Sequence, residues 1–455
     1  MPQTVAAIAT PLAPAGLGVV RVSGEEALAV ADRVFRAKGR GKRLGDLPGY
    51  TALYGHVADA AGEIDDCVAL VFRAPHSYTG EDVVEFSCHG GRYLLTRVLQ
   101  ALLEAGAVPA GPGEFTKRAF LHGKMDLTQA DAVMDLIGAQ GALAARAALS
   151  AREGALHRAL ERVKESLLGV AAQAAAYVDY PDDEIPALRG DTLRVTLAEA
   201  ADELSRLLRT FEAGRVLREG VDTVIVGSPN VGKSTLMNLL AGCERSIVTD
   251  TAGTTRDIVE ETVRLGNVTL RLSDTAGIRR TEDQVETIGV ERARARLRTA
   301  SLVLAVLDGS RPLTEEDREL LREISGRPAV CLVNKSDCPP AFDPQVVREW
   351  AKEVVVISAK TGEGLLALTQ AVERLTGVAA IDGSEALLGT VRQRDAVSRC
   401  LRCVEEALQA ARNGMTPDVI TVSVEDAVSA LLELTGERVN EAVVNEVFAR
   451  FCVGK

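Results

Sequence analysis

The stretch that most constrains the fold is Gly227-Ser-Pro-Asn-Val-Gly-Lys-Ser234, which has the spacing G-x-x-x-x-G-K-[ST]. It follows the apolar run 221–226 and precedes the helical pattern 235–240, which is the strand–loop–helix context of a phosphate-binding loop. The glycines of such a loop let backbone N–H groups curl around phosphate oxygens, and the helix N-terminus adds a favourable dipole. Lys233 is then expected to reach the β- and γ-phosphates, and the Ser234 hydroxyl to bind Mg²⁺.

Three further motifs stand at the ends of later apolar runs. Asp274-Thr-Ala-Gly277 is placed to hold Mg²⁺ through water and to meet a γ-phosphate. Asn334-Lys-Ser-Asp337 ends in a carboxylate that can accept two N–H bonds from a guanine edge, a donor pattern that adenine lacks. Ser358-Ala-Lys360 suits backbone contact with the base oxygen. In their order and spacing, these motifs make residues 218–377 resemble a GTPase of the Ras-like superfamily.

Two positions bear on hydrolysis. Thr255, in the segment between the loop and Asp274, takes the place of a second Mg²⁺ ligand that is ordered only when the γ-phosphate is present. Position 278, where such proteins often carry a water-orienting Gln, is Ile. Asn230, with carbonyls of the loop 249–254, is therefore a candidate for binding a monovalent cation that supplies the charge of an arginine finger. Glu286 is a candidate for orienting the attacking water.

The positions predicted to bind the nucleotide and its ions come from these motifs, and Lys233 is also predicted to take part in catalysis. Besides Lys233 they are Asn230, Val231, Gly232, Ser234, Thr235, Thr249, Asp250, Thr251, Ala252, Gly253, Thr254, Thr255, Asp274, Thr275, Ala276, Gly277, Asn334, Lys335, Asp337, Ser358, Ala359 and Lys360.

The chain is long enough for two to four domains, with 455 residues of which 47% are hydrophobic. Residues 1–123 mix short strand-like runs with helices, which predicts an α+β N-terminal domain. Residues 124–217 and 378–455 are helical in pattern and predict one all-α domain. Residues 218–377 alternate strands and helices, so we predict an α/β Ras-like P-loop GTPase domain inserted into the helical one.

Several local elements follow from the same patterns. Strands are expected over 68–72 and 83–86, and a helix over 93–105. Asp126 and Gln129 have the spacing of a capping box. In the inserted domain the apolar runs predict five strands, over 221–226, 268–273, 301–307, 328–333 and 354–357.

Bulk properties favour a cytoplasmic protein. No apolar run approaches the ~20 residues of a membrane span, and the N-terminus lacks the basic-then-apolar order of a signal peptide. The eight cysteines are scattered; Cys400 and Cys403 form a lone C-x-x-C, which we interpret as packed thiols rather than zinc ligands. The formal charge of −12 argues against a protein built mainly to coat nucleic acid or anionic membrane.

The flanks carry a more specific resemblance. The segments 75–85, with Ser-Tyr-Thr-Gly-Glu-Asp, 88–91, with Cys-His-Gly-Gly, and 112–130, with Gly-Lys-Met-Asp-Leu-Thr-Gln-Ala, resemble the N-terminal part of the MnmE (TrmE) family of tRNA modification GTPases. The chain also ends Phe-Cys-Val-Gly-Lys455, close to that family's C-terminal Cys-Ile-Gly-Lys. The order of N-terminal domain, helices, inserted GTPase domain and helices matches as well.

This resemblance implies a potassium-stimulated GTPase that works with the flavoprotein MnmG, in a heterotetramer, to modify C5 of the wobble uridine in certain tRNAs. It implies a homodimer that binds 5-formyltetrahydrofolate, with GTP hydrolysis driving closure of paired GTPase domains. The implied folate residues are Arg21, Glu81, Lys124 and Lys455; the implied potassium ligands are Asn230, Thr249, Thr251 and Thr254. Glu286 becomes the hydrolysis residue, and Cys452 lies by the modification chemistry or is a packed terminal thiol.

Two departures and two other functions accompany this interpretation. Pro11-Leu-Ala-Pro-Ala-Gly16 lacks an Arg that the family usually carries there, and Thr251 replaces a commonly aliphatic residue whose carbonyl is the expected ligand.

A regulatory GTPase for ribosome assembly is the main alternative; it needs neither a folate pocket nor a terminal Cys. A folate-dependent methyltransferase fused to a sensor domain is disfavoured, because no second nucleotide or flavin fingerprint is evident. Since the chain is acidic, most tRNA contacts are expected to come from MnmG.

Overall fold

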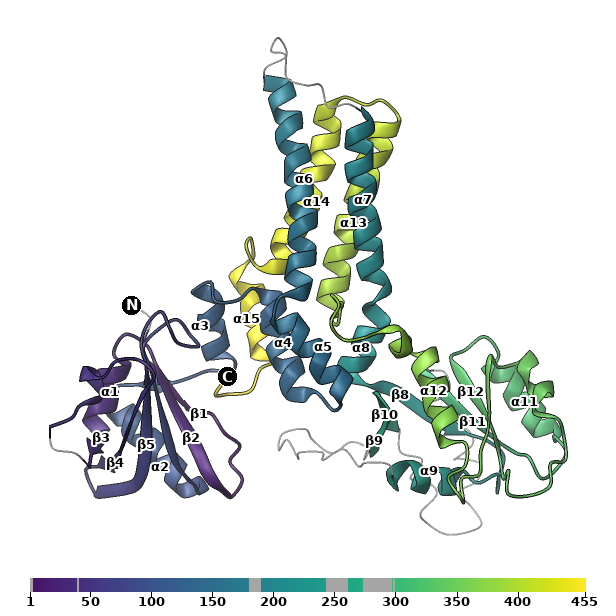
Figure 1. The fold of residues 1–455 in the computed structure, drawn as a ribbon, viewed down its shortest axis with the longest axis horizontal. Helices are drawn as coiled ribbons and strands as arrows, with labels where there is room; N and C mark the ends of the chain where they lie inside the picture. The colour runs from purple at the N-terminus through teal and green to yellow at the C-terminus, as the bar shows by residue number, and fades with distance from the viewer. Residues whose placement is uncertain (1–2, 39–40, 180–189, 243–260, 273–296, 298) are drawn as a thin grey trace. The chain divides into compact units, whose positions relative to one another are not determined.

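A computed structural model describes residues 3–38, 41–179, 190–242, 261–272, 297 and 299–455 (Figure 1). The chain divides into two compact units, which are described separately. The first comprises Met1–Met134 and Ser429–Lys455, and the second comprises Asp135–Val428. The predicted class, an α+β N-terminal region, a helical region and a P-loop α/β region, is confirmed.

A seven-stranded sheet forms the centre of the first unit, in the order β3-β4-β5-β6-β2-β1-β7. Neighbouring strands are antiparallel except β1 and β7, which are parallel. The strands are β1 Val5–Ile8, β2 Ala15–Ser23, β3 Phe35–Ala37, β4 Thr51–Asp59, β5 Gly62–Phe72, β6 Val83–Gly90 and β7 Val108–Pro109, with a short 3₁₀ turn η1 at Leu44–Asp46. Both strands predicted here lie within this sheet.

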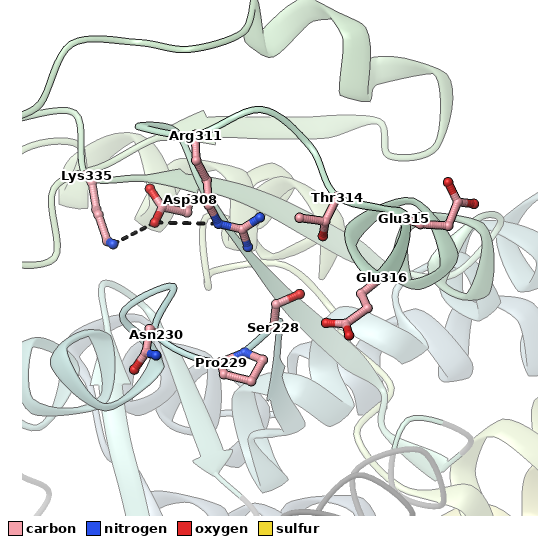
Figure 2. A pocket seen from close by; sticks show the side chains of 9 residues that line it. All are labelled: Ser228, Pro229, Asn230, Asp308, Arg311, Thr314, Glu315, Glu316 and Lys335. Carbon is pink, nitrogen blue, oxygen red and sulfur yellow. Dashed lines mark hydrogen bonds and ion pairs between the residues drawn. The ribbon is translucent and has the colours of Figure 1, made fainter.

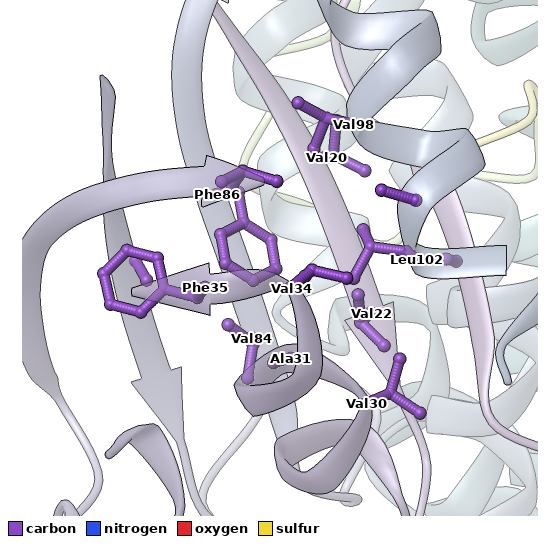
Figure 3. Packing of buried hydrophobic residues seen from close by; sticks show 14 of the residues in the cluster. Val20, Val22, Val30, Ala31, Val34, Phe35, Val84, Phe86, Val98 and Leu102 are labelled. Atoms are coloured by element: carbon purple, nitrogen blue, oxygen red, sulfur yellow. The ribbon is translucent and has the colours of Figure 1, made fainter. Parts of the chain in front are cut away.

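Helices α1 (Ala27–Val34) and α2 (Arg92–Glu104) cover one face of that sheet (Figure 3). Alternate residues of β2 and β6, such as Val20 with Val22 and Val84 with Phe86, point into the core between them. Each helix contributes residues one turn apart, as the period of 3.6 requires. Because side chains alternate across a strand, the intervening β2 and β6 residues belong to the opposite face.

The end of the chain returns to the first unit. Helix α15 (Glu441–Ala449) packs with α3 (Glu114–Leu121) and the start of α4 (Leu127–Gly138) around the buried rings of Phe448 and Phe451. The predicted capping box is present, because Asp126 N donates to Gln129 Oε1 at 3.0 Å and Gln129 N donates to Asp126 Oδ1 at 2.7 Å.

The second unit contains a set of long helices. They are α5 Ala142–Arg152, α6 Ala155–Asp179, α7 Gly190–Arg209, α8 Phe211–Glu219 and α13 Val391–Arg412; α14, Pro417–Thr435, crosses from this unit into the first. Helix α7 packs against both α6 and α13. Apolar residues at helical spacing are buried in these helices, among them Leu197 and Leu204 of α7 and Val397 and Val404 of α13. Among the described residues, no helix is long and apolar enough to cross a membrane.

The second unit also holds a six-stranded sheet in the order β13-β12-β11-β8-β10-β9. The strands are β8 Val221–Val226, β9 Glu261–Leu265, β10 Val268–Leu272, β11 Leu302–Asp308, β12 Ala329–Asn334 and β13 Glu353–Val356. Helices α9 (Lys233–Gly242) and α12 (Leu365–Leu375) pack on one face, and α11 (Glu315–Ile324) on the other. Two 3₁₀ turns, η2 Pro344–Glu349 and η3 Val378–Ala380, complete the connections.

The five predicted strands of this sheet are confirmed to within a residue or two at their ends, and their mutual pairing is parallel. Strand β9 was missed. It pairs antiparallel with β10 at the sheet edge through a tight turn at Gly266-Asn267. The available signal was the alternation of buried Val263 and Leu265 before that turn.

Gly214 in α8 provides a test of the packing between α8 and the segment that leads to α13. A Cβ at this position would lie 2.2 Å from the Leu388 carbonyl oxygen, whereas one at Gly169 in α6 would meet nothing within 4 Å. We expect Gly214→Ala to lower the thermal unfolding midpoint by the equivalent of about 1–3 kcal/mol, because the backbone must move.

Gly169→Ala is the matched control, and it should raise the midpoint by the equivalent of up to about 1 kcal/mol through helix propensity. Scanning calorimetry of the two variants measures both effects. A rise for both variants would contradict the packing.

Candidate functional sites

The phosphate-binding loop follows β8 and needs glycine at both of its glycine positions. Gly227 has φ 155° and Gly232 has φ 101°, in the region that side chains disfavour. A Cβ at Gly227 would lie 2.3 Å from the Val306 carbonyl oxygen, and one at Gly232 would lie 2.3 Å from Asn334 Nδ2. The loop therefore lies against the ends of the neighbouring strands, too close for a side chain at either glycine.

Lys233 is the first residue of α9, and its ammonium group bends back over the loop. Lys233 Nζ donates to the Gly227 carbonyl at 2.8 Å and to the Ser228 carbonyl at 2.7 Å. Ser234 and Thr235 are exposed in the same first helical turn. The arrangement places one cation, two hydroxyls and a helix N-terminus together, which is the chemistry that binds a polyphosphate.

The turn 334–337, termed the base-recognition turn after its predicted role, is attached to the phosphate loop by one buried side chain. Asn334, at the end of β12, donates from Nδ2 to the Val231 carbonyl at 2.8 Å and accepts at Oδ1 from Ala359 N at 2.9 Å. Asn334 was predicted to contact the nucleotide; here its amide joins the phosphate loop to the segment 358–360. Lys335 follows in a left-handed conformation with φ 67°.

Asp337 is exposed, and its Oδ1 accepts a hydrogen bond from Ser358 Oγ at 2.7 Å. That hydrogen bond is the main reason that the pKa of Asp337 lies below its ordinary value. Its carboxylate is therefore ionised at neutral pH and acceptor-only, which suits the N–H groups of a guanine edge. Lys360 is exposed beside it.

Other predicted positions of the nucleotide site lie outside the described residues. They are Thr249, Asp250, Thr251, Ala252, Gly253, Thr254, Thr255, Asp274, Thr275, Ala276, Gly277 and Glu286.

A second candidate site lies in the first unit, on the sheet face opposite α1 and α2. Arg21 of β2 pairs with Glu85 of β6 at 2.7 Å from Nε to Oε1, and its guanidinium carbon lies 5.7 Å from the Tyr78 ring centroid and 5.2 Å from that of Phe115. Arg21 also donates to the Gly454 carbonyl at 3.4 Å. This predicted folate residue thus lies between two aromatic rings and the chain terminus.

The C-terminal residues are held by backbone contacts. Val453 forms an antiparallel bridge with Pro112, Gly113 N donates to the Cys452 carbonyl at 3.3 Å, and Phe115 N donates to the Lys455 carbonyl at 3.1 Å. These contacts fix the backbone of the terminal tetrapeptide, while the Cys452 side chain stays exposed. Lys455 and Arg21 are therefore near one another, although they are 434 positions apart in sequence.

Glu81 is buried and already has strong partners. Its two carboxylate oxygens accept from Arg118 NH1 at 3.1 and 3.0 Å, and Oε2 accepts from Ser23 Oγ at 2.7 Å. Arg118, 7% exposed, was missed, because the sequence does not say which of Lys117 and Arg118 points inward. Lys124 is exposed and donates to the Pro75 carbonyl at 3.0 Å.

The C-x-x-C pair agrees with the packed-thiol interpretation. Cys400 is buried in α13, and burial raises the pKa of its thiol to about 12. Burial likewise raises the pKa of the Cys403 thiol. A thiol with a raised pKa is a poor nucleophile and metal ligand. Within the part of the chain that the structure describes, no group of three or more His, Cys, Asp or Glu is arranged to hold a metal.

The parallel sheet, the glycine-constrained phosphate loop and the acidic base-recognition turn define a P-loop GTPase. Residues 4–124 match the model for the GTP-binding protein TrmE N-terminus, and residues 127–452 match that for the MnmE helical domain. The chain belongs to the MnmE family of tRNA modification GTPases, as its sequence predicted, and as a member it is a GTP hydrolase that acts in tRNA modification.

Relatives match over the full length. The tRNA modification GTPase MnmE of Symbiobacterium thermophilum is 44% identical over 457 residues, covering 100% of this chain and 99% of that protein. The protein of the same name from Geobacillus kaustophilus is 42% identical, with coverage of 100% and 99%, and that from Bacillus subtilis is 40% identical, with complete coverage of both chains.

The guanine-recognition role of Asp337 can be tested by Asp337→Asn. The amide presents a donor toward the base where the carboxylate presents only acceptors, so we expect preference to shift from guanine to xanthine nucleotides. Competition binding of GDP and XDP measures the shift. Asp343→Asn is the matched control, since Asp343 caps a 3₁₀ turn and Asn caps equally well. Unchanged preference in Asp337→Asn would exclude the role.

Proposed function

We propose that this chain is a potassium-stimulated GTPase that works with the flavoprotein MnmG on tRNA. Together they would add aminomethyl or carboxymethylaminomethyl groups to C5 of the wobble uridine. The observation that carries the proposal is the match to the family over the whole chain. The same polypeptide has a phosphate-binding loop and also a second site, in which Arg21 lies beside the Tyr78 ring and the Gly454 carbonyl. A GTPase that acted only as a switch has no need of the second site.

The nucleotide part of the proposal assigns roles to individual groups. Ser234 and Thr255 bind Mg²⁺, with Asp274 acting through water, and Lys233 neutralises charge on the β- and γ-phosphates. Asn230, Thr249, Thr251 and Thr254 bind K⁺. Asn230 is the member of this set within the described residues, and its exposed amide at φ 60° supports the proposal. Glu286 orients water in place of the Gln that Ile278 replaces.

The N-terminal site is proposed to bind 5-formyltetrahydrofolate through Arg21, Glu81, Lys124 and Lys455. The cations suit the glutamyl carboxylate, and the rings around Arg21 suit a flat heterocycle. The Glu81 carboxylate has little remaining capacity to accept hydrogen bonds from a folate. Three of its roughly four acceptor positions are taken by Arg118 and Ser23, which leaves one for a pterin N–H. Cys452 is proposed to lie by the modification chemistry, and its exposed side chain on the fixed tail supports this role.

The assembly part of the proposal is a homodimer that joins MnmG in a heterotetramer in the cytoplasm. GTP hydrolysis would drive pairing of the GTPase domains and a conformational change, rather than supply the chemistry at uridine. The charge of −12 supports tRNA contacts made mainly by the partner. We retain residues 1–123, 124–217, 218–377 and 378–455 as the proposed domain boundaries.

Potassium dependence is expected in the turnover number. In KCl, kcat for GTP should exceed that in NaCl of equal ionic strength by about tenfold or more, because a correctly seated cation stabilises transition-state charge. Asn230→Ala should remove the difference while GDP affinity changes little. Steady-state phosphate release in the two salts measures it. Equal kcat in both salts for the unaltered protein would contradict the cation proposal.

The folate site and the tRNA activity are tested together by complementation. Cells without this protein should lose wobble-uridine modification, and Arg21→Ala should not restore it. The purified variant should keep GTP hydrolysis but bind 5-formyltetrahydrofolate at least about tenfold more weakly, since a charge-assisted contact is lost. Arg43→Ala, which removes an exposed guanidinium in the same unit, is the control. Normal tRNA modification in the deletion strain would favour the ribosome-assembly alternative.

A further inference from the structure

A pocket of about 590 Å³ lies beside the phosphate loop (Figure 2). Its lining comes from the phosphate loop, the end of β11, the start of α11 and the base-recognition turn. Figure 2 shows Lys335 and Arg311 both directed at Asp308. Asp308 and Arg311 lie outside the motifs by which the nucleotide site was recognised, and Ser228 occupies a variable position of the phosphate loop.

The polar side chains here form one continuous chain of contacts. Lys335 Nζ lies 2.6 Å from Asp308 Oδ2, and Arg311 Nε lies 3.8 Å from the same oxygen. Arg311 NH1 lies 3.1 Å from Asp317 Oδ2, and Ser228 Oγ donates to Asp317 Oδ1 at 2.7 Å. The base-recognition turn at Lys335 is thereby linked to the phosphate loop at Ser228 through two carboxylates, and Arg311 is the group that joins them.

Both carboxylates are ionised although they are buried. Burial opposes ionisation of Asp308, 7% exposed, but hydrogen bonds from Lys335 and Ser310 outweigh it, so its pKa lies below the ordinary value. Burial also opposes ionisation of Asp317, 1% exposed, and hydrogen bonds from Ser228 and Thr314 again lower its pKa. Two buried anions need cations. Arg311 lies between them and contacts both, whereas Lys335 contacts Asp308.

We propose that Arg311 is a positioning residue for guanine-nucleotide binding, which couples the base-recognition turn to the phosphate loop through Asp308 and Asp317. Without Arg311, Asp308 pairs with Lys335 alone, and Asp317 accepts from Ser228 with no guanidinium to compensate its charge. One link between the two nucleotide-contacting segments is then lost, while the Asn334 amide still joins them. The inference rests on the nucleotide site described above.

The test is a comparison of Arg311→Ala with Arg318→Ala in the full chain. Arg311 precedes α11, whereas Arg318 lies within it and pairs with exposed Glu315. We expect Arg311→Ala to weaken GDP and GTP binding about tenfold and to raise KM in proportion, with kcat at saturation within about twofold. Arg318→Ala should bind as the unaltered protein does.

A double-mutant cycle separates coupling from local damage. If Asp317 transmits the effect, Ser228→Ala should weaken binding less in the Arg311→Ala background than alone. Additive losses, or unaltered binding in Arg311→Ala, would overturn the inference. If Arg311→Ala does not fold, Arg311→Gln is measured by the same criteria. The variant Asp337→Asn tests base recognition independently of Arg311. If Arg311→Ala binds nucleotide normally while Asp337→Asn changes its base preference, the role of Arg311 is excluded and the proposed function is unaffected.

Discussion

The nucleotide site depends on the buried amide of Asn334. With one donor and one acceptor it joins the Val231 carbonyl in the phosphate loop to the Ala359 N–H in the segment 358–360, which is predicted to contact the base. Because it is 3% exposed, either partner left unpaired would carry a desolvation cost of about 1–3 kcal/mol. The amide also limits Gly232 to glycine, since a Cβ there would reach Nδ2. Three segments that are far apart in sequence are thus held in one arrangement before a ligand arrives.

A comparable constraint in the first unit is a buried ion pair on the side of its sheet away from α1 and α2. Arg118 and Glu81 form a buried ion pair, and loss of one partner from such a pair typically costs about 3–5 kcal/mol. Arg118 NH2 also donates to the Gln3 carbonyl at 2.8 Å, so the pair holds the N-terminal strand region as well as α3. The C-terminal tail then lies against this framework beside Arg21. The candidate site of this unit is therefore built from residues near both ends of the chain.

Much of the fold could be predicted from periodicity. The runs that became β8, β11, β12 and β13 are largely apolar, because a parallel sheet is covered on both faces, and this gave a strong local signal. Strand β10 instead alternates, with Val268, Leu270 and Leu272 buried. Strand β9 was missed because an edge strand with one buried face carries only two core residues, Val263 and Leu265. The capping box of α4 was predicted correctly, since its four residues are contiguous and need no tertiary partner.

The nucleotide motifs could be read directly because their chemistry is local: a glycine, a lysine and a carboxylate at fixed offsets around a strand end. The partners that position those groups could not be predicted from the sequence. Ser228, Asp308, Arg311 and Asp317 are separated by up to 89 positions, and nothing in their spacing indicates that they meet. The same holds for Arg118 with Glu81. Sequence by itself determined the family of the chain and which groups are candidates for binding. Tertiary structure alone decided which buried charges hold those groups, because such pairing depends on which side chains the packed elements exclude from water.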